Sequence, residues 1–170
     1  MENAIVSLIC IVLILAGTLT VAMSSFSSVD SLSQSWKEME NQARQVRETE
    51  IVAVKAVVPD EYSGSRVEIT IRNDGGVSLA NFDRWDVIVR YEEGTVQWLP
   101  HGPSTPGWTV GGIFFGGGPE AIEPDILNPD EEVLLILSLD PPVTQGAVNQ
   151  ATVSTPRGVI TSIMFKWEVP

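Results

Sequence analysis

The chain has 170 residues, with 22 acidic and 10 basic side chains and a formal net charge of −12. Of these, 16 acidic and 7 basic side chains follow residue 50, so the excess of acid lies mostly in the C-terminal part. A surface of this charge repels nucleic-acid phosphates and anionic lipid headgroups, which argues against both as partners of that part. The single cysteine, Cys10, has no partner for an intrachain disulfide, and no Cys/His cluster indicates zinc.

The first element is a long apolar segment with no basic residue in front of it. Residues 3–29 contain no Asp, Glu, Lys or Arg, and the first lysine is Lys37. The length predicts a membrane-spanning helix, yet signals and anchors normally carry basic residues on their cytoplasmic flank. Three explanations compete: a signal anchor, a cleavable secretory signal, or a helix from which a short basic leader has been removed. We favour the third, since the apolar region is too long for a cleavable signal and lacks an Ala-x-Ala site.

The helical period continues beyond the apolar run. From Phe26 to Val46, apolar residues recur every three or four positions, and neither Gly nor Pro occurs in residues 18–58. We expect one helix from about residue 2 to about residue 50, forming a polymerisation domain of residues 1–50. A helix that is apolar on every side has to be covered by lipid or by copies of itself. The residues predicted to pack between subunits are Ile5, Leu8, Ile9, Val12, Leu13, Leu15, Leu19, Met23, Phe26, Val29, Leu32, Trp36 and Met39.

From Ile51 onward the hydrophobic period changes to two, which is typical of strands. Short β-type runs, among them "RVEITIR", "WDVIVRY" and "EVLLILSL", alternate with turns such as 73–76 and a Pro-containing loop at 101–107. The segment 116–120 is expected to be a loop. Six to eight strands at this spacing predict an antiparallel, immunoglobulin-like β-sandwich over residues 51–170. The expected fold class is therefore α+β, a long hydrophobic helix followed by a β-sandwich head.

No constellation of residues predicts an active site. His101 is the only histidine and lies in a Pro/Gly loop without a nucleophile at suitable spacing. Acidic groups at 120–125 and 130–132 lack the regular spacing of a calcium loop, and a solvated acidic rim is the preferred interpretation. The glycine-rich stretches do not open a helix and are not phosphate loops. We expect no enzyme activity, no cofactor and no metal.

An apolar N-terminal helix with an amphipathic continuation is followed by the strand motifs "ITIRNDGGVSL", "WDVIVRY", "LNPDEEVLLILSL" and "TPRGVITSIMFKW". In these features the chain resembles the archaellins and archaeal type-IV-pilin-like subunits. The resemblance implies a flagellin-like extracellular filament with helices in the core and sandwiches outside. It also implies a prepilin-type peptidase that removes a leader, a stay in the cytoplasmic membrane before assembly, and a filament motor with platform proteins. Where bacterial type IV pilins carry an acidic residue at position five, this chain has Ile5.

Three functions follow from these observations. The leading hypothesis is a structural subunit of an archaellum-like helical filament used for swimming, since heterologous contacts that do not close build a filament. An adhesion pilus subunit has the same design. An accessory protein anchored by one helix, such as a stator of the filament motor, would need the segment 24–50 only as a tether, whereas a filament needs the continuous packing stripe found there.

Overall fold

The computed structural model describes residues 2–120, 122–123 and 125–168; within the helix it describes the side chains of residues 7–20, 29, 31–41, 43–44 and 48. By contacts, the chain divides into two compact units, residues 1–44 and 45–170. We call the second the sandwich unit. The fold is α+β, as expected from the change of hydrophobic period near residue 51.

Helix α1 runs from Glu2 to Glu48 over 47 residues, close to the bounds that the sequence predicts. The hydroxyl groups of Thr18 and Thr20 donate to the carbonyl oxygens of Leu15 and Ala16, at 3.0 and 2.8 Å. The hydroxyl groups therefore make their hydrogen bonds within the helix, so both residues can be buried in an apolar contact without an unpaired donor. In the described part of the chain, no helix is long and apolar enough to cross a membrane.

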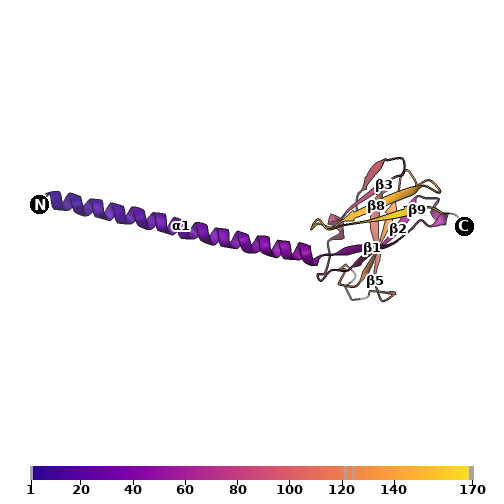
Figure 1. Ribbon diagram of the computed structural model, residues 1–170, viewed down its shortest axis with the longest axis horizontal. Helices are drawn as coiled ribbons and strands as arrows, with labels where there is room; N and C mark the ends of the chain where they lie inside the picture. Colours follow the sequence, from indigo (N-terminus) through magenta and orange to yellow (C-terminus); the bar gives the residue numbers. More distant parts are fainter. Residues whose placement is uncertain (1, 121, 124, 169–170) are drawn as a thin grey trace. The chain divides into compact units, whose positions relative to one another are not determined.

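The sandwich unit consists of two antiparallel sheets (Figure 1). The five-stranded sheet has the order β1 (Ile51–Val57), β2 (Arg66–Asn73), β7 (Glu132–Ser138), β5 (Gly107–Phe115) and β6 (Gly118–Pro119). The four-stranded sheet has the order β4 (Val96–Leu99), β3 (Asp86–Arg90), β8 (Val148–Ser154) and β9 (Ile160–Lys166). Short 3-10 helices lie at η1 (Asp60–Tyr62) and η2 (Phe82–Arg84).

The predicted loop at 116–120 is partly a strand, which corrects the expectation from sequence. Phe114 and Phe115 pair with Pro119 and Gly118, so β5 and β6 form a hairpin with a two-residue turn. Gly116 and Gly117 both have positive φ, 59° and 85°, as the tightest hairpin turns require. The run of glycines therefore makes a turn between paired strands, and the described residues contain nine strands where six to eight were expected.

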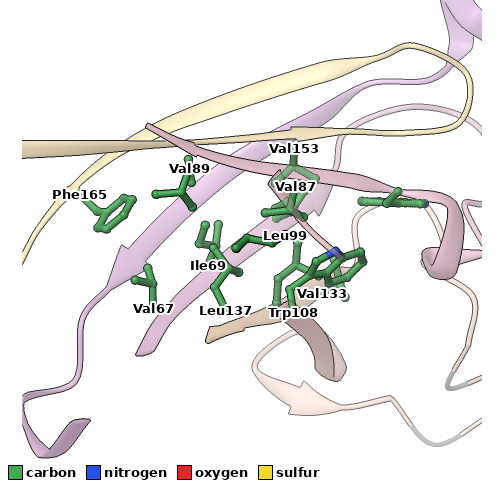
Figure 2. Packing of buried hydrophobic residues seen from close by; sticks show 14 of the residues in the cluster. Val67, Ile69, Val87, Val89, Leu99, Trp108, Val133, Leu137, Val153 and Phe165 are labelled. Carbon is green, nitrogen blue, oxygen red and sulfur yellow. The ribbon is translucent and has the colours of Figure 1, made fainter. Parts of the chain in front are cut away.

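The core lies between the two sheets. The alternation in "RVEITIR" correctly predicts Val67, Ile69 and Ile71 as inward, and all three are fully buried. Val87 and Val89 of β3 bury against them from the other sheet, together with Leu99 of β4. Figure 2 shows the labelled side chains of β2, β3 and β4 directed toward one another between the strands, with Phe165 near one end of the layer and Trp108 near the other.

On the outer side of the five-stranded sheet, Gly111 leaves room for two neighbouring side chains. A Cβ atom at this position would lie 3.0 Å from Cγ1 of Ile136, 3.1 Å from Cδ2 of Leu134, and closer still to Cδ1 of Ile136. Both side chains of β7 therefore lie over the backbone of β5, and both are half-buried. The missing side chain of Gly111 allows this sheet to cover its own outer apolar residues.

The turn after β2 holds the segment that joins the helix to the first strand. Gly76 N donates to the carbonyl oxygen of Glu48 at 2.8 Å, which satisfies one of the carbonyls left free at a helix C-terminus. Asp74 N and Gly75 N donate to the carbonyl oxygen of Glu50, at 3.0 and 3.1 Å. A Cβ atom on Gly75 would collide with the backbone of Glu48 and Glu50, so the close approach requires glycine.

Asn73 is the buried centre of this turn. Its amide nitrogen donates to the carbonyl oxygens of Val77 and Leu127, at 2.9 and 3.0 Å, and its Oδ1 accepts from Gly75 N at 3.1 Å. The residue is fully buried. On the surface beside it, Arg72 forms a two-pronged ion pair with Asp74, and this hydrogen bonding lowers the pKa of the Asp74 carboxyl. The side chain of this asparagine therefore closes its own turn and joins it to the segment at Leu127.

Tyr91, directly after β3, closes one end of the sandwich. Its ring is 3% exposed, and its hydroxyl donates to the carbonyl oxygen of Pro141 at 2.8 Å. Burial, with smaller contributions from Glu93 and Asp140, raises the pKa of Tyr91 to about 12. The neutral phenol is therefore the form that the folded state prefers.

This preference predicts that the sandwich unit loses stability at alkaline pH. Unfolded Tyr91 ionises near pH 10, so the stabilisation is complete below that pH and is lost as the pH rises through about 12. Between pH 10 and 12, we expect the free energy of unfolding of the wild type to fall by up to about 2 kcal/mol more than that of Tyr91→Phe, which has no phenol at this position to ionise. Urea unfolding of the full chain in detergent, followed by tryptophan fluorescence, measures it. Tyr62→Phe, at the other, exposed tyrosine, should follow the wild type; equal curves for wild type and Tyr91→Phe would contradict the assignment.

Candidate assembly surface

The first part of the candidate surface is the apolar segment of α1. Its large aliphatic side chains from Leu8 to Leu19 are each between 53 and 66% exposed, and Leu13 is the most exposed of them. Every side chain of residues 7–20 is exposed in the single chain. A segment that presents Leu, Ile and Val in all directions is stabilised when lipid or protein covers it, by about 1.5–3 kcal/mol for each side chain that becomes fully buried.

The second part is the stripe on the following turns of α1. Val29, Leu32, Trp36 and Met39 recur at steps of three and four residues, and each is at least 60% exposed, with Trp36 at 74%. Lys37 and Glu40 lie at other positions of the same turns. A helix with this pattern presents a narrow apolar seam to a partner and polar side chains elsewhere. Of the thirteen packing residues predicted from the sequence, the side chains of Ile5, Met23 and Phe26 lie outside the described residues. The other ten are exposed, and their contact with other subunits stays a prediction.

The other candidates from the sequence, His101 and the acidic groups, form no catalytic or metal-binding arrangement among the residues that the structure describes. His101 packs edge-on against the ring of Trp108, with 4.7 Å between ring centroids. It lines a shallow cavity of about 610 Å³ with Phe82, Asp83 and Asp125. Among the described side chains, no group of three or more His, Cys, Asp or Glu is arranged to hold a metal ion.

Two features of the sandwich unit escaped the sequence analysis. The "NDGG" motif predicts a turn, and there is one, but the role of Asn73 in holding the segment 48–50 depends on contacts far apart in the chain. The aromatic residues of the sandwich unit differ in burial. In the structure Trp85 and Trp108 are buried, whereas Trp98 is 57% exposed. Trp98 and Leu99 are neighbours in β4 and therefore point to opposite faces of the sheet, so a buried Leu99 places Trp98 on the exposed face.

No protein-family model matches the sequence, and no curated protein does. Solved structures share its fold. A subunit of the archaeal flagellum of Methanospirillum hungatei strain JF1 aligns over 95% of this chain and 93% of its own, at 12% identity and a TM-score of 0.65. The archaellum periplasmic stator protein FlaG from Sulfolobus acidocaldarius aligns over 69% of this chain and 99% of its own, at 22% identity and a TM-score of 0.55.

A third structure, the archaeal flagellin FlaB1 from Methanocaldococcus jannaschii, aligns over 72% of this chain and 91% of its own, at 11% identity and a TM-score of 0.56. The fold is therefore archaellin-like, and it is shared by filament and stator components of archaella. The sandwich unit is about three quarters of the chain, so the alignment with the flagellum subunit extends into α1.

Proposed function

We propose that the chain is a structural subunit of an extracellular, archaellum-like helical filament. Residues 1–50 act as the polymerisation domain, and residues 51–170 form an immunoglobulin-like head. One observation carries the proposal: the side chains of residues 7–20 are exposed all round the helix, and the stripe from Val29 to Met39 continues this apolar surface. Copies of the same helix supply the cover, and non-closing contacts between copies propagate a filament.

The route to the filament is part of the same proposal. The helix is held in the cytoplasmic membrane until a prepilin-type peptidase removes a leader, and motor and platform proteins then build the polymer. The acidic heads, with 16 acidic and 7 basic side chains after residue 50, coat the filament and keep neighbouring filaments apart. Swimming is the use we favour; adhesion is served by the same architecture. No enzymatic step and no cofactor belongs to this function.

A second candidate is an accessory protein of the filament motor, anchored by α1 in the membrane. It is favoured by the identity to the stator protein FlaG, 22%, which exceeds the 12% shared with the flagellum subunit. In this case one copy of α1 would act as a tether, and the stripe at Val29, Leu32, Trp36 and Met39 would have no repeating partner.

Shearing of cells that produce the chain separates the two functions. For a filament subunit, we expect this chain to be the major protein of the sheared and pelleted filaments, with its N-terminus defined by sequencing of that band. Swimming assays on a deletion strain then distinguish motility from adhesion. Recovery of the chain only as a minor protein of the membrane fraction would overturn the filament proposal in favour of the accessory one.

A further inference from the structure

The turn after β2 contains the one Asp-Gly sequence of the chain, Asp74-Gly75, and the chain has no Asn-Gly. In such a sequence the backbone nitrogen of the glycine can attack Cγ of the aspartate, because glycine has no side chain that hinders the approach. A C–N bond forms, the C–OH bond of the protonated carboxyl breaks, and one water molecule leaves. Water then opens the resulting succinimide to either aspartate or isoaspartate, in which the main chain runs through the former side chain.

In the folded chain, hydrogen bonds hold both groups that take part in this reaction. Gly75 N donates to the carbonyl oxygen of Glu50 and to Oδ1 of Asn73, each at 3.1 Å. The Asp74 carboxylate accepts from Nε and Nη2 of Arg72, the second at 3.0 Å. Before the ring can close, the nitrogen must therefore lose its acceptors, and the carboxylate must leave Arg72 and take up a proton.

Arg72 also controls how much of the carboxyl is in the reactive form. Its hydrogen bond lowers the pKa of the Asp74 carboxyl, so the protonated fraction near neutral pH is smaller than for a free aspartate. The side chains of Arg72 and Asp74 are 42 and 27% exposed, and they line a cavity of about 560 Å³ that is open to solvent. Water therefore reaches the turn, and its hydrogen bonds, rather than the exclusion of water, protect it.

The product of the reaction does not fit this turn. Isoaspartate lengthens the main chain by one carbon atom and leaves the α-carboxyl as a branch. A Cβ atom on Gly75 would lie 2.5 Å from Glu50 N and closer still to the carbonyl oxygen of Glu48, so there is no room for an added atom. The hydrogen bonds from Gly75 to Glu50 and from Gly76 to Glu48 would be lost. Isoaspartate at position 74 would therefore release the segment 48–50 from the turn.

We infer that Asp74-Gly75 is a site of spontaneous isoaspartate formation, and that Arg72 and the carbonyl oxygen of Glu50 protect it in the folded chain. The step needs no reactant other than water. Isoaspartate at position 74 then accumulates in proportion to the time that the segment 48–50 spends away from the turn. The inference is the same for a filament subunit and for an accessory protein, because the turn and the segment both belong to the sandwich unit.

Ageing of the purified full chain in detergent tests the protection. The chain and a synthetic peptide of residues 66–80 are kept at physiological temperature and neutral pH, and mass spectrometry with electron-transfer fragmentation measures isoaspartate at position 74. The peptide lacks Glu50 and the fold, so it gives the unprotected rate. We expect the chain to react at least about tenfold more slowly, because the hydrogen bonds of Gly75 N must break before attack. Equal rates in the chain and the peptide would overturn the inference.

A matched pair of variants tests the part that Arg72 plays. We expect Arg72→Ala to form isoaspartate at least about threefold faster than the wild type, because more of the Asp74 carboxyl is protonated. Arg66→Ala removes an arginine at the opposite end of β2, where it forms an ion pair with Glu68 at 2.7 Å, and it should age as the wild type does. An unchanged rate in Arg72→Ala, or an equal increase in both variants, would overturn the role of Arg72.

Discussion

Leu13→Asp is expected to abolish filament assembly. Leu13 is the most exposed aliphatic side chain of the apolar segment, at 66%, and the filament would enclose it among aliphatic residues of neighbouring helices. A carboxylate there has no partner, and burying it costs at least several kcal/mol for each subunit. Since about 1.4 kcal/mol changes an equilibrium constant tenfold, the concentration needed for assembly should rise at least about a hundredfold. Leu15→Asp should behave in the same way.

The measurement is the amount of this chain in sheared filaments relative to the amount in the cells. Gln34→Asp is the matched control, because it adds the same charge to an exposed position on α1 that does not belong to the predicted packing set. It should assemble nearly as wild type does. Normal filaments from Leu13→Asp would show that the apolar segment is not the filament core. Unchanged tryptophan fluorescence from the head would show that the substitution acts on assembly and not on folding.

Asn73→Ala is expected to give a large loss of stability in the sandwich unit. It removes the donors to the carbonyl oxygens of Val77 and Leu127 and the acceptor for Gly75 N; Asn73 is fully buried, the bond to Leu127 is buried, and the other two bonds are partly buried. Leaving buried polar groups unpaired costs about 1–3 kcal/mol each, and partial relaxation of the turn recovers some of this. We expect the free energy of unfolding to fall by about 3 kcal/mol, a large share of the 5–15 kcal/mol that is typical of a domain.

Denaturant unfolding of the full chain in detergent, followed by tryptophan fluorescence, measures this loss. Asn73→Asp keeps an acceptor for Gly75 N but turns a carboxylate oxygen toward two carbonyl oxygens, so it should destabilise at least as much as alanine does. Asn41→Ala, at an exposed position of α1, should leave the unfolding midpoint unchanged. A midpoint for Asn73→Ala within the error of wild type would show that the three hydrogen bonds contribute little.

Much of the fold was predictable because its signals are local. Side chains in a strand alternate strictly between faces, so "RVEITIR" and "WDVIVRY" reveal their buried sides without reference to any partner. No proline occurs before Pro59 and no glycine between Gly17 and Val58, which indicates one uninterrupted helix. Helix α1 ends within two residues of the predicted bounds, residues 2 and 50. The order of strands in the sheets depends on contacts between distant segments, and the local pattern does not contain it.

For the candidate surfaces, too, the sequence reveals what depends on local pattern and not what depends on contacts between distant segments. The apolar residues of α1 are evident from composition, but the partners that bury them belong to other copies, so the single chain shows only their exposure. The open face of the four-stranded sheet was not predicted, because Trp98 and Ile88 become neighbours only through the register of β3 with β4. Alternation assigns each residue to a side of its own strand, and only the register assembles those sides into a surface.

Gly111 contributes to a difference between the outer sides of the two sheets. Because Ile136 and Leu134 lie over the bare backbone of β5, neither of them is among the exposed large hydrophobic side chains, whereas Val54 and Val57 of the edge strand β1 and Phe115 of β5 are. Among the sheet surfaces described, most of the exposed large hydrophobic side chains then lie on the four-stranded sheet, on the opposite side of the sandwich. A bulky residue at position 111 would push Ile136 and Leu134 outward and add apolar surface to the outer side of the five-stranded sheet.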